Sequence, residues 1–269
     1  MSDPRPQTLL LTFLGIHLQG RPVAVASSSV IDVLAGLDIS EEATRSTLAR
    51  MTNKGLLVRH RRGRQAYFEL TPRSRLVLEE GARRMWESSP VNRDWDGRWT
   101  LIGFSLPESW RQQRHDLRSR LIWGGFGPLQ NGLWIAPAVV DVPELLADLR
   151  LDEHIRAFVA ETVKPTEARQ FVREAFELES LEAGYRGFLE RWDRRRPLPA
   201  LRDDLVRELL LQAEWLQLLR LDPRLPLEHL PADWPAPQAE EVFHDLAAAF
   251  REPAARAAGS LLDLIEITP

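Results

Sequence analysis

Arginine side chains are concentrated between positions 45 and 64, where their spacing suits contact with duplex DNA better than catalysis. Arg45 and Arg50 stand on the polar side of an amphipathic stretch, and a basic run follows, Arg59-His60-Arg61-Arg62-Gly63-Arg64. Arginine can bind the two acceptors on the edge of guanine with paired hydrogen bonds, and it also binds phosphate. A charged run by itself is more often a solvated hairpin, so the elements that carry these residues decide between the two interpretations.

Residues 39–70 have the layout of a winged helix-turn-helix. Ser40 can cap a helix that ends at Gly55, because serine is a favoured N-cap and glycine a common C-terminal stop. Two strands, at residues 56–60 and 65–70, follow around the basic turn Arg61 to Arg64. This order favours DNA binding over a solvated hairpin. The head should hold three further helices, at residues 8–19, from a cap among Ser27, Ser28 and Ser29 to Leu37, and from Pro72 to about Glu87.

The apolar spacing of the helix after Ser40 divides its residues into two faces. Thr44, Thr47, Leu48 and Met51 recur at intervals of three and four, so they should pack inward. The opposite face and the basic run should face DNA. The residues expected to contact DNA are Glu42, Ala43, Arg45, Ser46, Arg50, Arg59, Arg61, Arg62 and Arg64.

Different roles are expected within this set. Arg45 is the candidate for reading a guanine edge, because paired hydrogen bonds from arginine are the commonest specific contact. Arg50 and the arginines of the turn should bind phosphate, which sets affinity rather than sequence preference. Glu41 and Glu42 leave two interpretations open. They could accept a hydrogen bond from cytosine, or they could simply begin the helix, where the helix dipole favours carboxylates; we favour the second.

The charge distribution places these arginines on the basic part of an otherwise acidic chain. The first 92 of the 269 residues hold 13 Lys and Arg against 9 Asp and Glu, and the remainder holds 22 against 30. A basic head can approach phosphates while an acidic body stays in solution. There is no cysteine, no apolar run long enough to span a membrane, and no signal-peptide pattern. We therefore expect a cytoplasmic protein that does not contact the membrane.

The rest of the chain is expected to form two further domains, which makes this an α+β protein of three domains. Residues 1–92 are the winged head with its linking helix. The pattern in residues 93–165 predicts strand, helix, strand, strand, helix and strand, which is the ferredoxin-like order. Residues 166–269 are mainly helical, and their aromatic side chains are expected to form a core rather than a ligand cage.

No constellation of residues predicts catalysis. The six histidines are scattered without an HxxxH or HExxH pair, there is no G-x-S-x-G motif, and the carboxylates lack metal-site spacing. Gly125-x-Gly127 lacks the remainder of a nucleotide-binding loop and is expected to be a turn. We therefore expect a binding protein rather than an enzyme, with no cofactor and no metal ion.

Motifs in all three segments resemble those of one family. They are ATRSTLARMTNKGLLVR and GRQAYFELT in the head, WDGRWTLIGFSLPES and GFGPLQNGLWIAP in the middle, and YRGFLERW and DPRLPLEHLPADWP at the end. They resemble the PaaX family of bacterial transcriptional regulators, the repressors of phenylacetic acid catabolism, and the head is also similar to the GntR-type winged helix. The resemblance implies a homodimer that binds an inverted-repeat DNA operator and is released by an acyl-CoA effector such as phenylacetyl-CoA.

The central segment also resembles a small ferredoxin-like CRISPR-associated nuclease. That nuclease uses an aspartate near the end of its first strand, whereas the corresponding stretch here, Gly103-Phe104-Ser105-Leu106, contains no acid. Inherited nuclease activity is therefore not expected. The alternative to a repressor is a nucleic-acid hydrolase or a thioester-binding protein. Its activity would lie in residues 93–269, and the winged head would serve as an interaction module.

The effector site is the least determined feature. A coenzyme A ester needs cations for its phosphates and an apolar slot for its acyl group. The candidates are four arginines beside the aromatic block, although a solvated linker is the favoured interpretation of the run that holds three of them. These arginines are Arg191, Arg194, Arg195 and Arg196.

Overall fold

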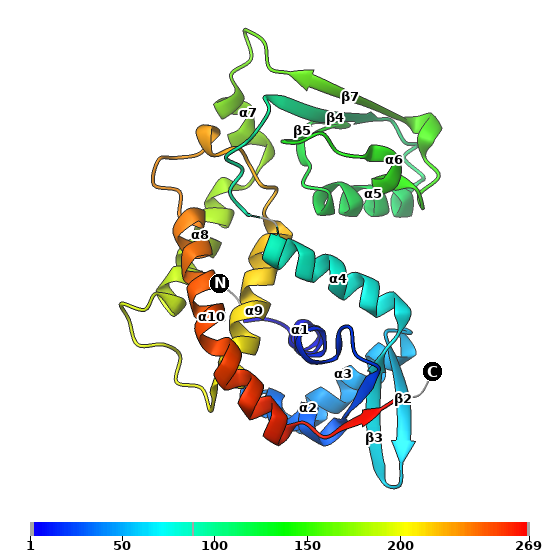
Figure 1. Cartoon of the computed structure of the whole chain (residues 1–269). Coiled ribbons are helices and arrows are strands. Elements are labelled where there is room, and N and C mark those ends of the chain that lie inside the picture. Colours follow the sequence, from blue (N-terminus) through cyan, green and yellow to red (C-terminus); the bar gives the residue numbers. More distant parts are fainter. Residues whose placement is uncertain (1–2, 88, 268–269) are drawn as a thin grey trace. The chain divides into compact units, whose positions relative to one another are not determined.

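The computed structural model describes residues 3–87 and 89–267 and shows a mixed α+β protein (Figure 1). Within those ranges it contains ten α-helices and two antiparallel four-stranded sheets, so the predicted α+β class is confirmed. The chain divides into two compact units. Unit 1 combines residues 3–87, 187–217 and 240–267, and unit 2 combines Ser89–Arg186 with Leu218–Ala239. Over the described ranges, no helix is both long and apolar enough to cross a bilayer.

Local signals in the sequence produce the first elements of unit 1. Ser40 caps the third helix, its hydroxyl accepting a hydrogen bond from Ala43 N at 3.2 Å. Gly55 follows that helix with φ +67°, a left-handed conformation that glycine adopts without strain. The elements are α1 (Pro6–Leu18), β1 (Val23–Ala26), α2 (Ser27–Ala35), α3 (Glu41–Asn53), β2 (Leu57–Arg62), β3 (Gln65–Leu70) and α4 (Pro72–Glu87).

A strand from the far end of the chain completes the sheet of unit 1. The sheet order is β2-β3-β1-β8, and β8 (Leu264–Glu266) pairs antiparallel with β1, placing Val25 opposite Leu264 (Figure 1). Ile265 and Ile267 pack against the buried Ala24, Ala26 and Tyr67. Neither strand was expected from the sequence, because each is short and is defined only by its partner.

The serines expected to cap α2 do not do so. Ala26 occupies the N-cap position, and no side chain caps the helix. Ser29 instead donates its hydroxyl to Leu261 O at 3.2 Å and accepts a hydrogen bond from Asp263 N at 2.9 Å. The prediction of a serine cap is therefore wrong, because the approach of β8 gives this hydroxyl a partner that no local pattern could reveal.

Helices from the C-terminal third supply much of the core of unit 1. They are α8 (Leu178–Trp192), α9 (Asp204–Leu221) and α10 (Ala236–Leu261), of which residues 187–217 and 240–261 belong to this unit. Trp215 and Phe243 are buried and stack with ring centroids 4.8 Å apart. An added Cβ at Gly36 in the head would lie 2.7 Å from Val206 of α9, so the two segments pack closely. Head and C-terminal helices thus share one core.

Unit 2 contains a sheet with helices on both faces. Its elements follow the predicted order: β4 (Arg98–Phe104), α5 (Arg111–Trp123), β5 (Gly127–Gln130), β6 (Leu133–Ala136), α6 (Val142–Leu146) and β7 (Ile155–Glu161). The sheet order is β5-β6-β4-β7, with all neighbours antiparallel. Ile102 packs with residues of α5 and α6, whereas its near neighbour Trp99 packs against α7 (Ala168–Ala175), as the two-residue repeat of a strand requires (Figure 1).

Candidate nucleic-acid interface

The outward face of α3 presents polar side chains to solvent. Thr44, Thr47, Leu48 and Met51 are buried, which confirms the predicted inward face. Glu41, Glu42, Arg45, Ser46, Ala49 and Arg50 are exposed, and Ala43 is half-buried. The side chains proposed to contact DNA from this helix are therefore available on its surface.

Arg45 is held by an acidic neighbour on the preceding turn. Its Nε lies 2.7 Å from Oε1 of Glu41, and both side chains are about 60% exposed. An exposed pair of this kind contributes only ~0.5 kcal/mol, so a stronger partner can replace it. This pair was not among the predictions for Glu41, although a spacing of four residues on a helix indicates such pairs. Arg50, by contrast, donates to Thr47 Oγ1 of the same helix at 3.2 Å.

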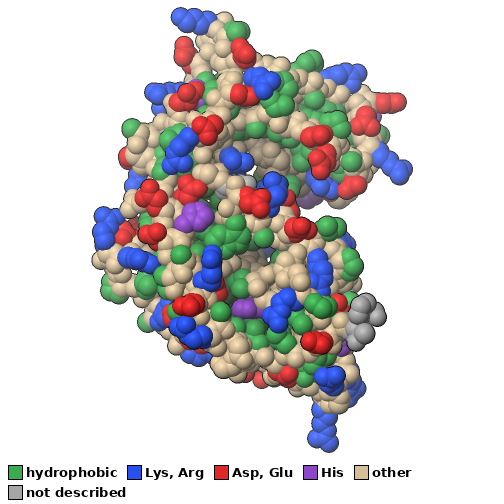
Figure 2. Space-filling view, in the orientation of Figure 1, with side chains coloured by type: hydrophobic (Ala, Val, Ile, Leu, Met, Phe, Trp, Pro, Cys, Tyr) green, Lys and Arg blue, Asp and Glu red, His purple; other side chains and the backbone are tan. Residues whose placement is uncertain are grey.

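The hairpin of β2 and β3 carries its arginines on both faces and at its tip. Arg62 pairs with Gln65, so the loop is only Gly63-Arg64 rather than the four residues expected. Gly63 has φ +61°, which a two-residue hairpin loop requires at its first position. Because side chains alternate along a strand, Arg59 and Arg61 lie on one face and Arg62 on the other. Figure 2 shows basic side chains at the tip of this hairpin.

Three of the four arginines considered for an effector bind groups of the protein itself. Arg191 binds the fully buried carboxylate of Glu214, and its Nη1 lies 3.0 Å from Oδ1 of Asp3. Arg195 binds Asp193, and its hydrogen bonds lower the pKa of that carboxyl to about 2. Arg194 donates to the carbonyl oxygen of Asp245 at 3.2 Å. Arg196 is exposed. The predicted effector role of these four arginines stays a prediction.

The aromatic residues between positions 171 and 188 form core, as expected. Phe171, Phe176, Tyr185 and Phe188 are all buried. The Tyr185 hydroxyl donates to the carboxylate of Asp222, whose pKa is raised to about 6 chiefly by burial. Within the part of the chain that the structure describes, no group of three or more His, Asp or Glu side chains could hold a metal ion.

An exposed polar helix followed by a basic hairpin, on an α+β fold, is typical of DNA-binding regulators. Three models of one family match the chain in consecutive segments. Residues 5–74 match "PaaX-like protein", residues 92–172 match "PaaX protein central Cas2-like domain", and residues 176–259 match "PaaX-like protein C-terminal domain". The chain belongs to the PaaX family, which confirms the resemblance seen in its sequence motifs.

Two known proteins extend the comparison. The chain is 28% identical over 251 residues to the transcriptional repressor PaaX of Escherichia coli K12. The aligned region covers 87% of this chain and 77% of that protein. A solved structure, the uncharacterized protein Rv0674 from Mycobacterium tuberculosis, is similar with a TM-score of 0.61 and 24% identity, covering 95% of this chain and 99% of the other. The second similarity concerns the fold alone.

Proposed function

We propose that this chain is a DNA-binding transcriptional repressor and not an enzyme. The observation that carries the proposal is the exposed polar face of α3, followed directly by the basic hairpin of β2 and β3. The relationship to a transcriptional repressor over most of both chains supports it. The nuclease that the central segment resembles has an aspartate near the end of its first strand. Here that strand, β4, ends at Phe104 and is followed by Ser105, so the alternative function of a hydrolase has no acid at this position.

We further propose three domains for this repressor. Residues 1–92 act as a winged helix-turn-helix, with α3 as the recognition helix and the β2–β3 hairpin as the wing. Residues 93–165 form a ferredoxin-like domain, supported by their element order and sheet order. Residues 166–269 form a mainly helical domain that contributes to the cores of both units.

The proposed active form is a homodimer on an inverted-repeat operator, released by an acyl-CoA effector such as phenylacetyl-CoA. A two-fold dimer would place its recognition helices about 34 Å apart, one turn of the duplex. Selection from random DNA, followed by light scattering of the complex, tests the proposal. The expected result is a palindromic site bound by two chains; a bound site without two-fold symmetry, or one chain per site, would count against the dimer.

Replacing Arg45 by alanine should weaken operator binding by about 1–3 kcal/mol and relax preference at one base pair of each half-site. The physical reason is that a guanidinium reads guanine with two hydrogen bonds, and alanine offers none. Fluorescence anisotropy on operator DNA and its single-base variants measures both effects. Arg173→Ala, an exposed arginine of α7, is the matched control. Equal weakening on every base variant would show that Arg45 contacts phosphate instead.

Neutralising Arg62 and Arg64 together by glutamine should flatten the salt dependence of DNA binding while leaving the preferred sequence unchanged. Each lost phosphate contact lowers the slope of log K against log salt by about 0.9, so the double variant should lose a slope of about 2. Anisotropy titrations over a range of salt concentrations measure the slope. A variant with Arg111 and Arg173 replaced by glutamine controls for net charge; an unchanged slope in the Arg62/Arg64 variant would refute the role of the wing.

A further inference from the structure

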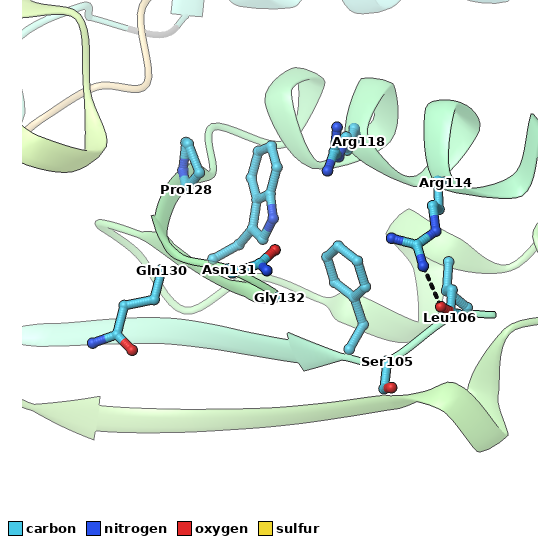
Figure 3. Close-up of a pocket in the computed structure, with 10 residues that line it drawn as sticks. Ser105, Leu106, Arg114, Arg118, Pro128, Gln130, Asn131 and Gly132 are labelled. Atoms are coloured by element: carbon cyan, nitrogen blue, oxygen red, sulfur yellow. Dashed lines mark hydrogen bonds between the residues drawn. The ribbon is translucent and has the colours of Figure 1, made fainter. Parts of the chain in front are cut away.

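A pocket of about 640 Å³ opens in unit 2 at the end of β4, between α5 and the turn that joins β5 to β6 (Figure 3). This volume lies within the roughly 300–1,000 Å³ typical of small-molecule sites. The pocket is lined by Phe104, Ser105, Leu106, Arg114, Arg118, Pro128, Gln130, Asn131, Gly132 and Trp134. It is thus separate from the arginines at positions 191 and 194–196.

The charge of this pocket is positive. Arg114 and Arg118 stand one turn apart on α5, and Figure 3 shows the Arg114 guanidinium extending from the helix to the carbonyl oxygen of Leu106. The Arg114 guanidinium donates to the carbonyl oxygens of Leu106 and Pro107, neutral acceptors that fix its position without cancelling its charge. Among the described residues that line the pocket, none is acidic. Like charges at this spacing repel each other, and an anion bound between them would remove the repulsion.

The remaining walls are apolar with polar edges. Trp134 is buried and Phe104 half-buried, which gives a flat ligand group two aromatic walls. Gln130 and Asn131 are exposed and place amide groups at the edge. Gly132 brings the turn close to β4: its carbonyl accepts from Phe104 N at 2.8 Å, and a Cβ there would lie 2.8 Å from Phe104 O. The walls therefore belong to a tightly joined strand end and not to a loose loop.

We propose that this pocket binds a small molecule with a phosphate or carboxylate group for Arg114 and Arg118 and a flat apolar part for Trp134 and Phe104. The proposal rests on the proposed function, because it takes this molecule to be the effector of the repressor. It places the effector site in the central segment, at the strand end where the related nuclease would carry its aspartate. The strand end has no acid, and the two cations that line the pocket from α5 suit a bound anion rather than a bound metal ion.

The test is calorimetric titration of the full chain with four probes: phenylacetyl-CoA, coenzyme A, phenylacetate and inorganic phosphate. The critical variant is Arg118→Glu, since Arg118 is exposed and its loss should leave the fold intact. Arg111→Glu, an exposed position at the start of the same helix and outside the pocket, is the matched control. Loss of a charge-assisted hydrogen bond should weaken binding roughly tenfold to hundredfold. Arg118→Lys should retain part of the affinity that Arg118→Glu loses, because lysine has the positive charge but not the paired donors of a guanidinium.

The outcomes separate this proposal from the repressor function. Weakening in Arg118→Glu but not in Arg111→Glu, for any probe that the wild type binds, supports the pocket, and the pattern of probes identifies whether phosphate or carboxylate is recognised. Equal binding by wild type and Arg118→Glu overturns the pocket even if the ligand still releases operator DNA. If the wild type binds none of the four probes, the proposed pocket is also overturned. Operator binding measured on the same sample then shows whether the repressor function stands.

Discussion

Replacing Arg191 by alanine lowers the free energy of unfolding by about 3–5 kcal/mol, because it leaves a buried carboxylate without its cation. Glu214 is fully buried and accepts from Arg191 and, at 2.6 Å, from Trp192 Nε1. Burial raises the pKa of Glu214, while the Trp192 hydrogen bond and the Arg191 charge oppose that rise. Urea unfolding followed by tryptophan fluorescence measures the loss.

A double variant makes this prediction specific. Arg191→Met combined with Glu214→Gln should recover most of the lost stability, because neither charge is left unpaired and the amide oxygen can still accept from Trp192 Nε1. Arg196→Ala, an exposed neighbour, should unfold close to the wild type. If Arg191→Ala is as stable as the wild type but no longer responds to an acyl-CoA ester, the arginine cluster is the effector site and the structural role assigned to Arg191 is wrong.

Replacing Glu208 by glutamine should make the protein more stable relative to the wild type as the pH rises. Glu208 on α9 is 7% exposed, and burial raises its pKa from 4.5 to about 7, with the charge of Arg251 acting against the shift. Its stabilising contribution is complete below about pH 4.5 and is lost as the pH rises through 7, because the folded protein must then bury a charge. A shift of this size corresponds to about 3 kcal/mol.

The difference in unfolding free energy between the variant and the wild type, measured from pH 5 to pH 8, isolates this group. His17 acts in the opposite direction, since burial and the nearby Arg21 lower its pKa to about 4, so its contribution to stability increases from pH 4 to 6.5. Both proteins contain His17, and its effect cancels in the difference. Parallel pH curves for the two proteins would show that Glu208 does not titrate as expected.

The helix and hairpin that we propose to contact DNA were predictable because their signals are local. The cap at Ser40, the inward spacing of Thr44, Leu48 and Met51, and the glycine at position 55 all fall within one short segment. The pairing of Arg45 with Glu41 was also accessible from the sequence, because a spacing of four residues on a helix indicates such pairs. The sequence pattern does not separate the arginines of the basic turn, whereas the strand register places Arg61 and Arg62 on opposite faces of the hairpin.

Features that depend on distant partners could not be predicted from the sequence. Ser29 looked like a helix cap until the chain near Asp263 supplied its hydrogen-bond partners, more than 230 residues away. Arg191 was one of four candidates for binding an effector, and the sequence did not reveal its ion pair with a buried glutamate of another helix. Arg114 and Arg118 lie on one helix, and the strand ends that make them part of a pocket come from other segments of the chain.

The sequence by itself determined the helices of the head, the order of helices and strands in residues 93–165, the exposed face of α3, the basic hairpin and the family. Helical hydrogen bonds, capping and the two periodic patterns involve residues only a few positions apart, so a short window contains the information. Only the tertiary structure decided that β8 joins the sheet of the head, that the C-terminal helices share its core, and which arginines are neutralised and which line a pocket. A short strand or a buried charge is stabilised by its partner, and that partner is set by how the whole chain packs.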